Sequence, residues 1–243
     1  MRVPTWRGDV ELEVSRIEGV ARVHGYDKIS ETTDMQVRPA QAGLDEIARR
    51  RVRRLISGHG FCEVMTYSLV ANQPVQLNQP WHDGDPVRLR NPVTKERGQM
   101  RLTCMANLLQ AKRHNLAHGV ENVDIYELQP VYLPREDNQQ PEEKLVLAAL
   151  TDRPEGLRVL KGVLANVIDE LGRDIQVTEK PGGDGPFERE MSVELHVDGQ
   201  LLGVAGIVAE NIAAEFDLRN RPALLEVDFD LLSEGCRFDQ PFE

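Results

Sequence analysis

The sequence predicts an α+β protein in which helices pack against a mostly antiparallel sheet. Helical and strand patterns follow one another in runs, as helix, strand, strand, helix, strand, strand, and do not alternate as in a doubly wound fold. Asp198-Gly199, between two apolar runs, is typical of a tight β-hairpin turn. The chain has 243 residues, of which 40% are hydrophobic and 28% charged, a composition typical of a soluble globular protein.

Three helices are predicted in the first half of the chain, and each has apolar residues three and four positions apart and a glycine at its end. They cover residues 11–24, 44–57 and 104–118, and Thr103 is a candidate N-cap of the third. Residues 30–43 are predicted to be a connector. Strands are predicted at 61–70, 87–90 and 123–133, and we expect Pro130 to interrupt the last of them.

The second half begins with a charged loop at 134–143 and an apolar strand at 144–150. The strongest amphipathic helix of the sequence covers 156–171 and ends at Gly172. After a glycine-rich loop at 181–186, the hairpin has strands at 193–197 and 200–208. A short helix at 209–216 and a strand at 224–229 complete the prediction.

Composition excludes several classes of protein. The net charge of -11 argues against an independent nucleic-acid-binding domain, which would carry a basic face. No apolar run approaches the roughly 20 residues that a membrane helix needs, and the first residues do not form a signal peptide. Cys62, Cys104 and Cys236 are far apart and odd in number, which indicates a reducing, cytoplasmic location.

Short motifs along the chain occur in a specific order, although each is weak alone. They are Val3-Pro4-Thr5-Trp6-Arg7-Gly8-Asp9, Gly60-Phe61-Cys62-Glu63-Val64-Met65-Thr66-Tyr67-Ser68-Leu69, Asn91-Pro92-Val93, Met100-Arg101-Leu102-Thr103, Arg113-His114-Asn115-Leu116, Ile125-Tyr126-Glu127-Leu128 and Leu201-Leu202-Gly203-Val204-Ala205-Gly206. In this order they resemble the bacterial phenylalanyl-tRNA synthetase β subunit, from the end of its DNA-binding-fold domain through its catalytic-like core. The sequence departs from the family at Gln129-Pro130 and at Pro186-Phe187-Glu188-Arg189.

The resemblance implies a domain organisation and a function. Residues 1–38 would end a DNA-binding-fold domain, 39–236 would form a class II synthetase-like core, and 237–243 would begin a linker to a further domain. The core would be a non-catalytic scaffold for the α subunit of phenylalanine-tRNA ligase, a cytoplasmic enzyme that charges tRNA(Phe) with phenylalanine and ATP. Its partners would be the α subunit and, within the complex, tRNA(Phe), with no membrane. When isolated, the core could form a homodimer that covers exposed apolar area.

The sequence also predicts that this core has no active site of its own. Class II synthetases hold a triphosphate with arginines and magnesium, because negative charge develops at the α-phosphate. Leu133-Pro134 stands where one such arginine is expected, and residues 201–216 contain no arginine or lysine. Glu210 and Glu215 lie there instead and would repel a triphosphate. ATP would therefore enter the function only through the α subunit.

A weak magnesium site is the one metal site that the resemblance implies. The family has an acidic cluster after its Trp-Arg-x-Asp motif, and oxygen ligands on one helical turn suit a hard cation. Asp9 and Glu18 match this cluster, whereas Ser15 and Gly19 replace two carboxylates. Alternatively, Asp9 caps the following helix and Glu18 is solvated.

Other interpretations stay open. His114 and His118 have a spacing that can bind zinc, but a polar helix face explains them as well. Five arginines on the helix at 44–57 would contact tRNA phosphate, the partner subunit or solvent, and the apolar stripe opposite them would serve core or subunit packing; they are Arg49, Arg50, Arg51, Arg53 and Arg54. The alternative functions are a non-enzymatic self-associating or protein-binding scaffold unrelated to tRNA charging, and an adenylate-forming ligase with unusual ATP contacts.

Overall fold

The computed structural model describes residues 3–31, 42–71, 77, 80–94, 97–135, 140–183 and 185–238. The chain divides into two compact units, Met1–Gln41 and Ala42–Glu243, and each is considered by itself. Most of the predicted connector at 30–43 lies outside the described residues. The domain boundaries given above stay a prediction.

The first unit contains helix α1 (Glu13–His24) and a short 3-10 turn, η1 (Tyr26–Lys28). Gly25, with φ of +99°, follows α1 and ends it, as the sequence predicts. No residue of α1 is buried, and the apolar residues Ile17 and Val20 are 62% and 53% exposed. The described part of this unit therefore has no hydrophobic core of its own.

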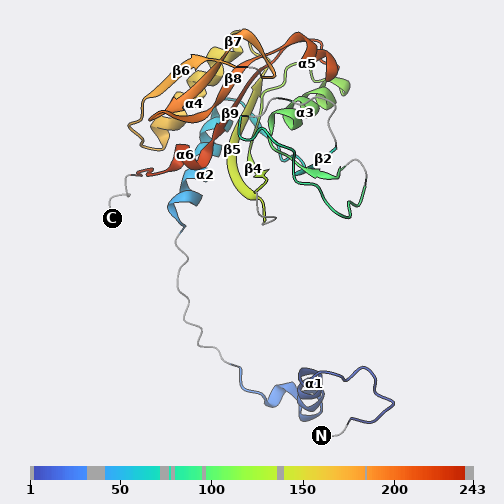
Figure 1. Ribbon diagram of the computed structural model, residues 1–243. Coiled ribbons are helices and arrows are strands. Elements are labelled where there is room, and N and C mark those ends of the chain that lie inside the picture. The colour runs from blue at the N-terminus through green and yellow to red at the C-terminus, as the bar shows by residue number, and fades with distance from the viewer. Residues whose placement is uncertain are drawn as a thin grey trace. The chain divides into compact units, whose positions relative to one another are not determined.

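The second unit is built on a seven-stranded sheet (Figure 1). Its strands, in spatial order, are β1 (Cys62–Glu63), β4 (Ile125–Leu133), β5 (Glu142–Thr151), β9 (Ala223–Asp228), β8 (Gln200–Val208), β7 (Phe187–Val197) and β6 (Val177–Pro181). Every neighbouring pair is antiparallel except β1 and β4. The predicted α+β class is confirmed. A separate two-stranded sheet joins β2 (Leu69–Val70) to β3 (Gln99–Met100).

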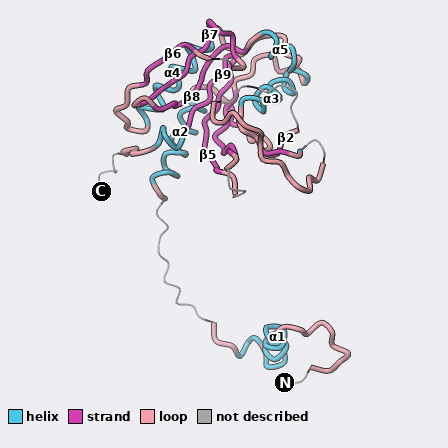
Figure 2. Tube along the Cα trace, in the orientation of Figure 1, coloured by secondary structure: helices cyan, strands magenta, loops and turns pink. Residues whose placement is uncertain are grey.

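Helices cover both faces of the large sheet (Figure 2). On one face α2 (Leu44–Gly58) and α4 (Gly156–Glu170) pack in a core that includes Leu147 and Ala149 of β5. On the other face α3 (Met105–Ala117) and α5 (Glu210–Glu215) pack with Val146 and Ala148 of the same strand. This alternation along β5 explains its continuous apolar sequence, since both faces are buried. Helix α6 (Phe229–Ser233) follows β9.

The predicted strand at 61–70 is wrong in its middle part. Backbone hydrogen bonds from Cys62 and Val64 to carbonyls of Asp124 and Tyr126 attach its beginning to β4. The next alternate amide, that of Thr66, donates instead to the carboxylate of Glu127. A buried side chain thus replaces the ladder partner, and the chain leaves the large sheet to form β2.

Pro130 does not interrupt β4, contrary to the prediction. It lies opposite Leu145 within the β4–β5 ladder. The amide of Tyr132 donates to Arg101 O, on the side of β4 that faces away from β5. Alternate residues point their N–H groups the same way, so the missing N–H of Pro130 removes nothing from the β5 ladder.

Three further differences concern weak sequence patterns. The predicted strand at 87–90 is reduced to a bridge between Arg88 and Gln99. Strand β6 and helix α6 were not predicted: β6 is largely exposed and polar, and α6 has only five residues. The hairpin is confirmed, because Asp198 and Gly199 both have positive φ, 52° and 81°, as a type I′ turn requires.

Substitution of Gly203 by Ala should destabilise the sheet. A Cβ there would lie 2.2 Å from Glu226 O and 2.7 Å from Val227 Cα, so β8 would have to move away from β9. We expect the free energy of unfolding to fall by about 1–3 kcal/mol, the usual effect of overpacking. Urea denaturation measures it, and the control is Gly162→Ala in α4, where the Cβ meets nothing within 4 Å. The control should be stabilising by up to about 1 kcal/mol; equal effects of both substitutions would contradict the packing described.

Candidate functional site: a polar row across the sheet

One row of paired residues crosses the centre of the large sheet. Glu127 of β4 pairs with Ala148 of β5, Ala148 with Glu226 of β9, Glu226 with Val204 of β8, and Val204 with Glu194 of β7. Glu127 and Glu226 are both 0% exposed. They are two strands apart, so their backbones are separated by about 10 Å. Two carboxylates therefore lie buried in the face of the sheet that α3 covers.

Glu127 is neutralised by Arg101 and held by Thr66. Arg101 Nη1 lies 2.9 Å from Glu127 Oε1 and also donates to Thr66 Oγ1 at 2.8 Å. Thr66 donates to the same carboxylate twice, through its amide at 3.0 Å and its hydroxyl at 2.7 Å. Arg101 Nε donates to the Pro130 carbonyl at 3.0 Å. The arginine is 2% exposed, so this ion pair is closed to solvent.

Among the described residues no cation contacts Glu226 directly, and neutral donors hold its carboxylate. Trp81 Nε1 donates to Oε1 at 2.7 Å, and the Cys104 amide donates to Oε2 at 2.7 Å. The Thr103 hydroxyl is 3.0 Å from both oxygens. Burial raises the pKa of Glu226, although the Trp81, Cys104 and Thr103 hydrogen bonds oppose this rise. Three donor residues from two segments of the chain, Trp81 and the adjacent Thr103 and Cys104, thus converge on one carboxylate.

The start of α3 is fixed by the same contacts. The predicted N-cap Thr103 lies one residue before the observed cap position, Cys104, and no side chain caps the helix there. Thr103 Oγ1 does accept a hydrogen bond from the Met105 amide at 3.0 Å. Thr103 therefore satisfies one free amide of α3 while it donates to Glu226.

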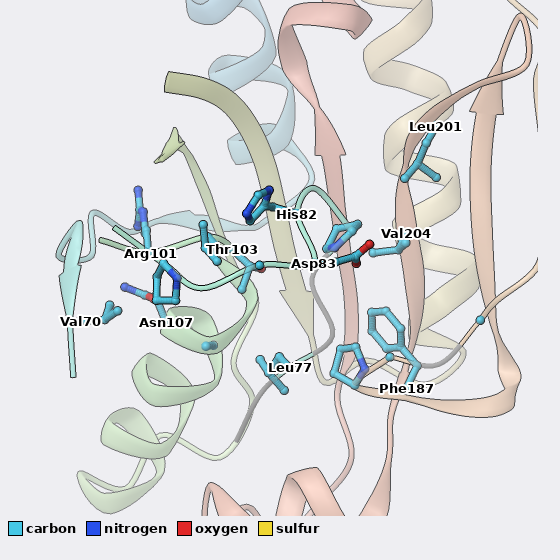
Figure 3. A pocket seen from close by; sticks show the side chains of 18 of the residues that line it. Val70, Leu77, His82, Asp83, Arg101, Thr103, Asn107, Phe187, Leu201 and Val204 are labelled. Carbon is cyan, nitrogen blue, oxygen red and sulfur yellow. The ribbon is translucent and has the colours of Figure 1, made fainter. Parts of the chain in front are cut away.

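A cavity of about 720 Å³ lies above the row (Figure 3). The figure shows Arg101 and Asn107 near Val70 at one side, and Phe187 and Val204 at the other. Further parts of the wall come from Pro80, from residues 82–86, which include His82, Asp83 and Asp85, and from Arg88 and Glu194.

The cavity contains cations that the sequence did not indicate. We predicted that no cation lies where a triphosphate would bind, because residues 201–216 contain no arginine or lysine, and that segment contributes Leu201 and Val204 to the lining. Arg88 and Arg101 line it from another part of the chain. The Met-Arg-Leu-Thr motif contains Arg101, but the role of this residue depends on Glu127, 26 positions away. A local pattern could not reveal it.

The predicted metal residues Asp9 and Glu18 each interact with an arginine. Asp9 forms an ion pair with Arg7 at 2.6 Å, and this hydrogen bond lowers the pKa of Asp9 to about 2. Glu18 pairs with Arg22, one helical turn away. In the described ranges, no three His, Cys, Asp or Glu side chains form a group that could bind a metal. An arginine pairs with each of the two carboxylates, and magnesium binding at this site stays a prediction.

Several alternative interpretations can now be compared with the structure. Asp9 does not cap α1, because Leu12 occupies the N-cap without a side-chain hydrogen bond. His118 Nδ1 lies 2.7 Å from the carbonyl of His114 on an exposed part of α3, which is in keeping with a polar helix face.

The two faces of α2 have different roles. The apolar stripe belongs to the core, since Ala48, Val52 and Ile56 are each 0% exposed. Three of the five arginines form ion pairs within the chain: Arg50 with Glu46 at 2.6 Å, Arg51 with Glu170 at 3.5 Å and Arg53 with Glu63 at 2.8 Å. The middle of the stripe is therefore buried within this chain, whereas Leu44 at its start is 58% exposed.

The fold is that of a class II aminoacyl-tRNA synthetase core. It is similar to a solved structure of a pyrrolysyl-tRNA synthetase from Desulfitobacterium hafniense, with a TM-score of 0.60 and 14% identity over 90% of this chain and 72% of that one. A crystal structure of pyrrolysyl-tRNA synthetase from the same organism gives 0.57 and 13%, over 97% and 83%.

The chain belongs to the family of the phenylalanyl-tRNA synthetase β chain CLM domain, whose sequence model matches residues 30–229. It is 33% identical to a phenylalanine–tRNA ligase β subunit from Halalkalibacterium halodurans and 29% identical to one from Geobacillus kaustophilus. The alignments cover 96% and 98% of this chain, but 31% and 32% of those proteins. The chain thus spans about a third of the length of these relatives. No helix in the described part of the chain is both long and apolar enough to cross a membrane.

The raised pKa of Glu226 predicts a pH dependence of stability. The unfolded state loses this proton near pH 4.5, and the folded state loses it at a higher pH. The contribution of Glu226 to the free energy of unfolding should therefore fall as pH rises through this window, by up to about 1.4 kcal/mol per pH unit.

Urea denaturation of the wild type and of Glu226→Gln across this window measures the effect, because glutamine cannot ionise. The stability of the wild type relative to the variant should fall with rising pH. Glu215→Gln, on the exposed side of α5, serves as the control and should not change the slope. A constant difference between wild type and Glu226→Gln would contradict the raised pKa.

Proposed function

We propose that this chain is the non-catalytic core of a phenylalanine-tRNA ligase β subunit. It would hold the catalytic α subunit, and the complex would charge tRNA(Phe) with phenylalanine at the expense of ATP, in the cytoplasm. Magnesium would enter with ATP at the α subunit. The observation that carries the proposal is the buried state of Glu226, at the centre of the sheet face on which the cavity lies.

A triphosphate would find little support on this face, where Arg88 is the one lining arginine without an ion pair among the described residues. Catalysis of adenylate formation needs donors and cations aimed at the developing negative charge. The Arg101 contacts go to Glu127, Thr66 and Pro130, and the donors around Glu226 all face its carboxylate. ATP would bring negative charge towards two buried carboxylates without displacing either. The chain would therefore keep the synthetase fold but lack the free cations and donors that stabilise negative charge during adenylate formation.

A contact surface for the α subunit is available next to the small sheet. Met65 is 82% exposed, Tyr67 65% and Val93 100%. The guanidinium carbon of Arg97 lies 3.7 Å from the centre of the Tyr67 ring. Tyrosine, methionine and arginine are enriched in protein interfaces, and an isolated two-stranded sheet is marginally stable alone. We place part of the α-subunit contact here.

The same exposed residues favour a second candidate, a scaffold that associates with itself. Met65 and Tyr67 of two copies could cover each other when no partner is present. Self-association alone would support the scaffold, whereas preferential binding of the α subunit would support the β-subunit function.

The isolated chain should catalyse no ATP–pyrophosphate exchange with phenylalanine, and it should form a complex with its cognate α subunit. Light scattering after size-exclusion chromatography measures the mass of the complex, and the exchange assay is run on the same fractions. Exchange above background by the chain alone would contradict the non-catalytic assignment. Failure to bind the α subunit would favour the scaffold.

Substitution of Met65 by Glu should weaken binding of the α subunit at least about tenfold, since a buried unpaired charge costs more than 1.4 kcal/mol. Titration calorimetry measures the dissociation constant. The matched control is Met191→Glu, at a residue that is 48% exposed on β7. If both substitutions left the affinity unchanged, the proposed contact surface would be wrong.

A further inference from the structure

We propose that α1 is a self-association surface, on which the apolar stripe of one copy packs antiparallel against the same stripe of a second copy of this chain. Three features of the first unit support this contact: an uncovered apolar stripe, polar groups at its two ends that complement each other, and an opposite face that is already paired within the helix. The contact lies in the first unit and goes beyond the proposed ligase function, which rests on the second unit.

The apolar stripe consists of Val14, Ile17, Val20 and Ala21. Successive residues of an α-helix are about 100° apart around its axis, so these four residues lie within an arc of about 120°. Val14 is 64% exposed, Ile17 62% and Val20 53%. The stripe therefore presents its apolar side chains to solvent.

Nothing in the described part of the first unit covers this stripe. That part contains one α-helix, one 3-10 turn and no strand (Figure 2), and no residue of α1 is buried. A helix of 12 residues, such as α1, is marginally stable alone in water. A partner that buries the stripe would therefore stabilise the helix.

The two ends of the stripe indicate that the partner is a second copy. Glu13 and His24 fall in the same arc as the apolar residues, one at each end of the helix. In a pair with two-fold symmetry, residue i meets residue j and j meets i. When Ile17 of one antiparallel helix lies at the level of Val20 of the other, Glu13 lies at the level of His24. The carboxylate can then accept a hydrogen bond from the imidazole at both ends of the pair.

The opposite face of α1 needs no partner. Glu18 and Arg22 lie outside the arc of the stripe and form an ion pair with each other, one helical turn apart. Burial of this face would remove both charges from water at a cost in free energy. Nucleic acid fits the helix less well than a second copy, because α1 carries two glutamates and two arginines and has no basic face.

Sedimentation equilibrium on the 243-residue chain should show a reversible equilibrium between monomer and dimer. Because one pair of short helices makes a small interface, we expect a dissociation constant in the micromolar range. A chain that stays monomeric at submillimolar concentration would leave the stripe to another occupant and overturn the proposal.

Ile17→Glu should weaken the dimer at least about tenfold, since each copy would bury an unpaired charge in the stripe. The matched control is Gly19→Glu, which adds the same charge two positions further along the helix, outside the stripe. A Cβ at Gly19 meets nothing within 4 Å, so this substitution should not weaken the dimer. If both substitutions weakened the dimer equally, or if Ile17→Glu left it unchanged, the stripe would not be the contact.

Glu13→Ala and His24→Ala test the antiparallel arrangement. Each should weaken the dimer about three- to tenfold, because each removes the contact at both ends of the pair. The double variant should be no weaker than either single variant, since both substitutions remove the same contact. Additive losses would show that Glu13 and His24 do not meet, and would overturn the antiparallel pairing.

Met65→Glu separates this contact from the exposed surface beside the small sheet, and it should leave the dimer unchanged. If Met65→Glu disrupted the dimer and Ile17→Glu did not, self-association would use that other surface and the inference would be wrong. No α subunit takes part in these measurements. Failure of the ligase proposal would show instead in the binding of that subunit, so the two failures can be told apart.

Discussion

The burial of Glu226 in the middle of the sheet is the constraint on which the rest of the second unit depends. A carboxylate at 0% exposure must be hydrogen-bonded, and its donors come from Trp81, Thr103 and the Cys104 amide. These contacts hold the segment around Trp81 and the start of α3 against β9, across more than 120 residues of sequence. The middle strand of the sheet therefore carries a carboxylate whose role is to hold the fold together.

The second buried carboxylate of the row, that of Glu127, is likewise satisfied inside the protein, by its ion pair with Arg101. It also explains two irregularities of the chain: the strand that begins with Cys62 leaves the sheet at Thr66, and β4 continues through Pro130, whose carbonyl receives Arg101 Nε. A class II synthetase fold can thus be kept while its reactive face is used for internal hydrogen bonds. On the proposed function, the lack of catalysis would follow from this use of the polar groups rather than from any loss of the fold.

The sequence predicted the elements that local pattern determines. The helices α2, α3 and α4 and the Asp198-Gly199 turn follow from periodicity and from glycine positions, and all appear within about two residues of the prediction. The sequence could not predict the polar row with its two buried glutamates. Glu226 stands in an alternating apolar strand, where a glutamate indicates an exposed face, and Arg101 needs a partner 26 residues away. The split of the strand at 61–70 was missed for the same reason, since a distant side chain replaces its backbone partner.

The central claim is that the two buried glutamates are satisfied internally and that no nucleotide binds over them. The most direct test is a methyl NMR titration of the chain with MgATP. Val204 lines the cavity, and Ala148 lies between the two buried glutamates in the row. If the polar groups are internally satisfied, both methyl signals should stay unchanged at millimolar nucleotide. Saturable shifts of both signals would show a nucleotide seated on the sheet and would contradict the non-catalytic account.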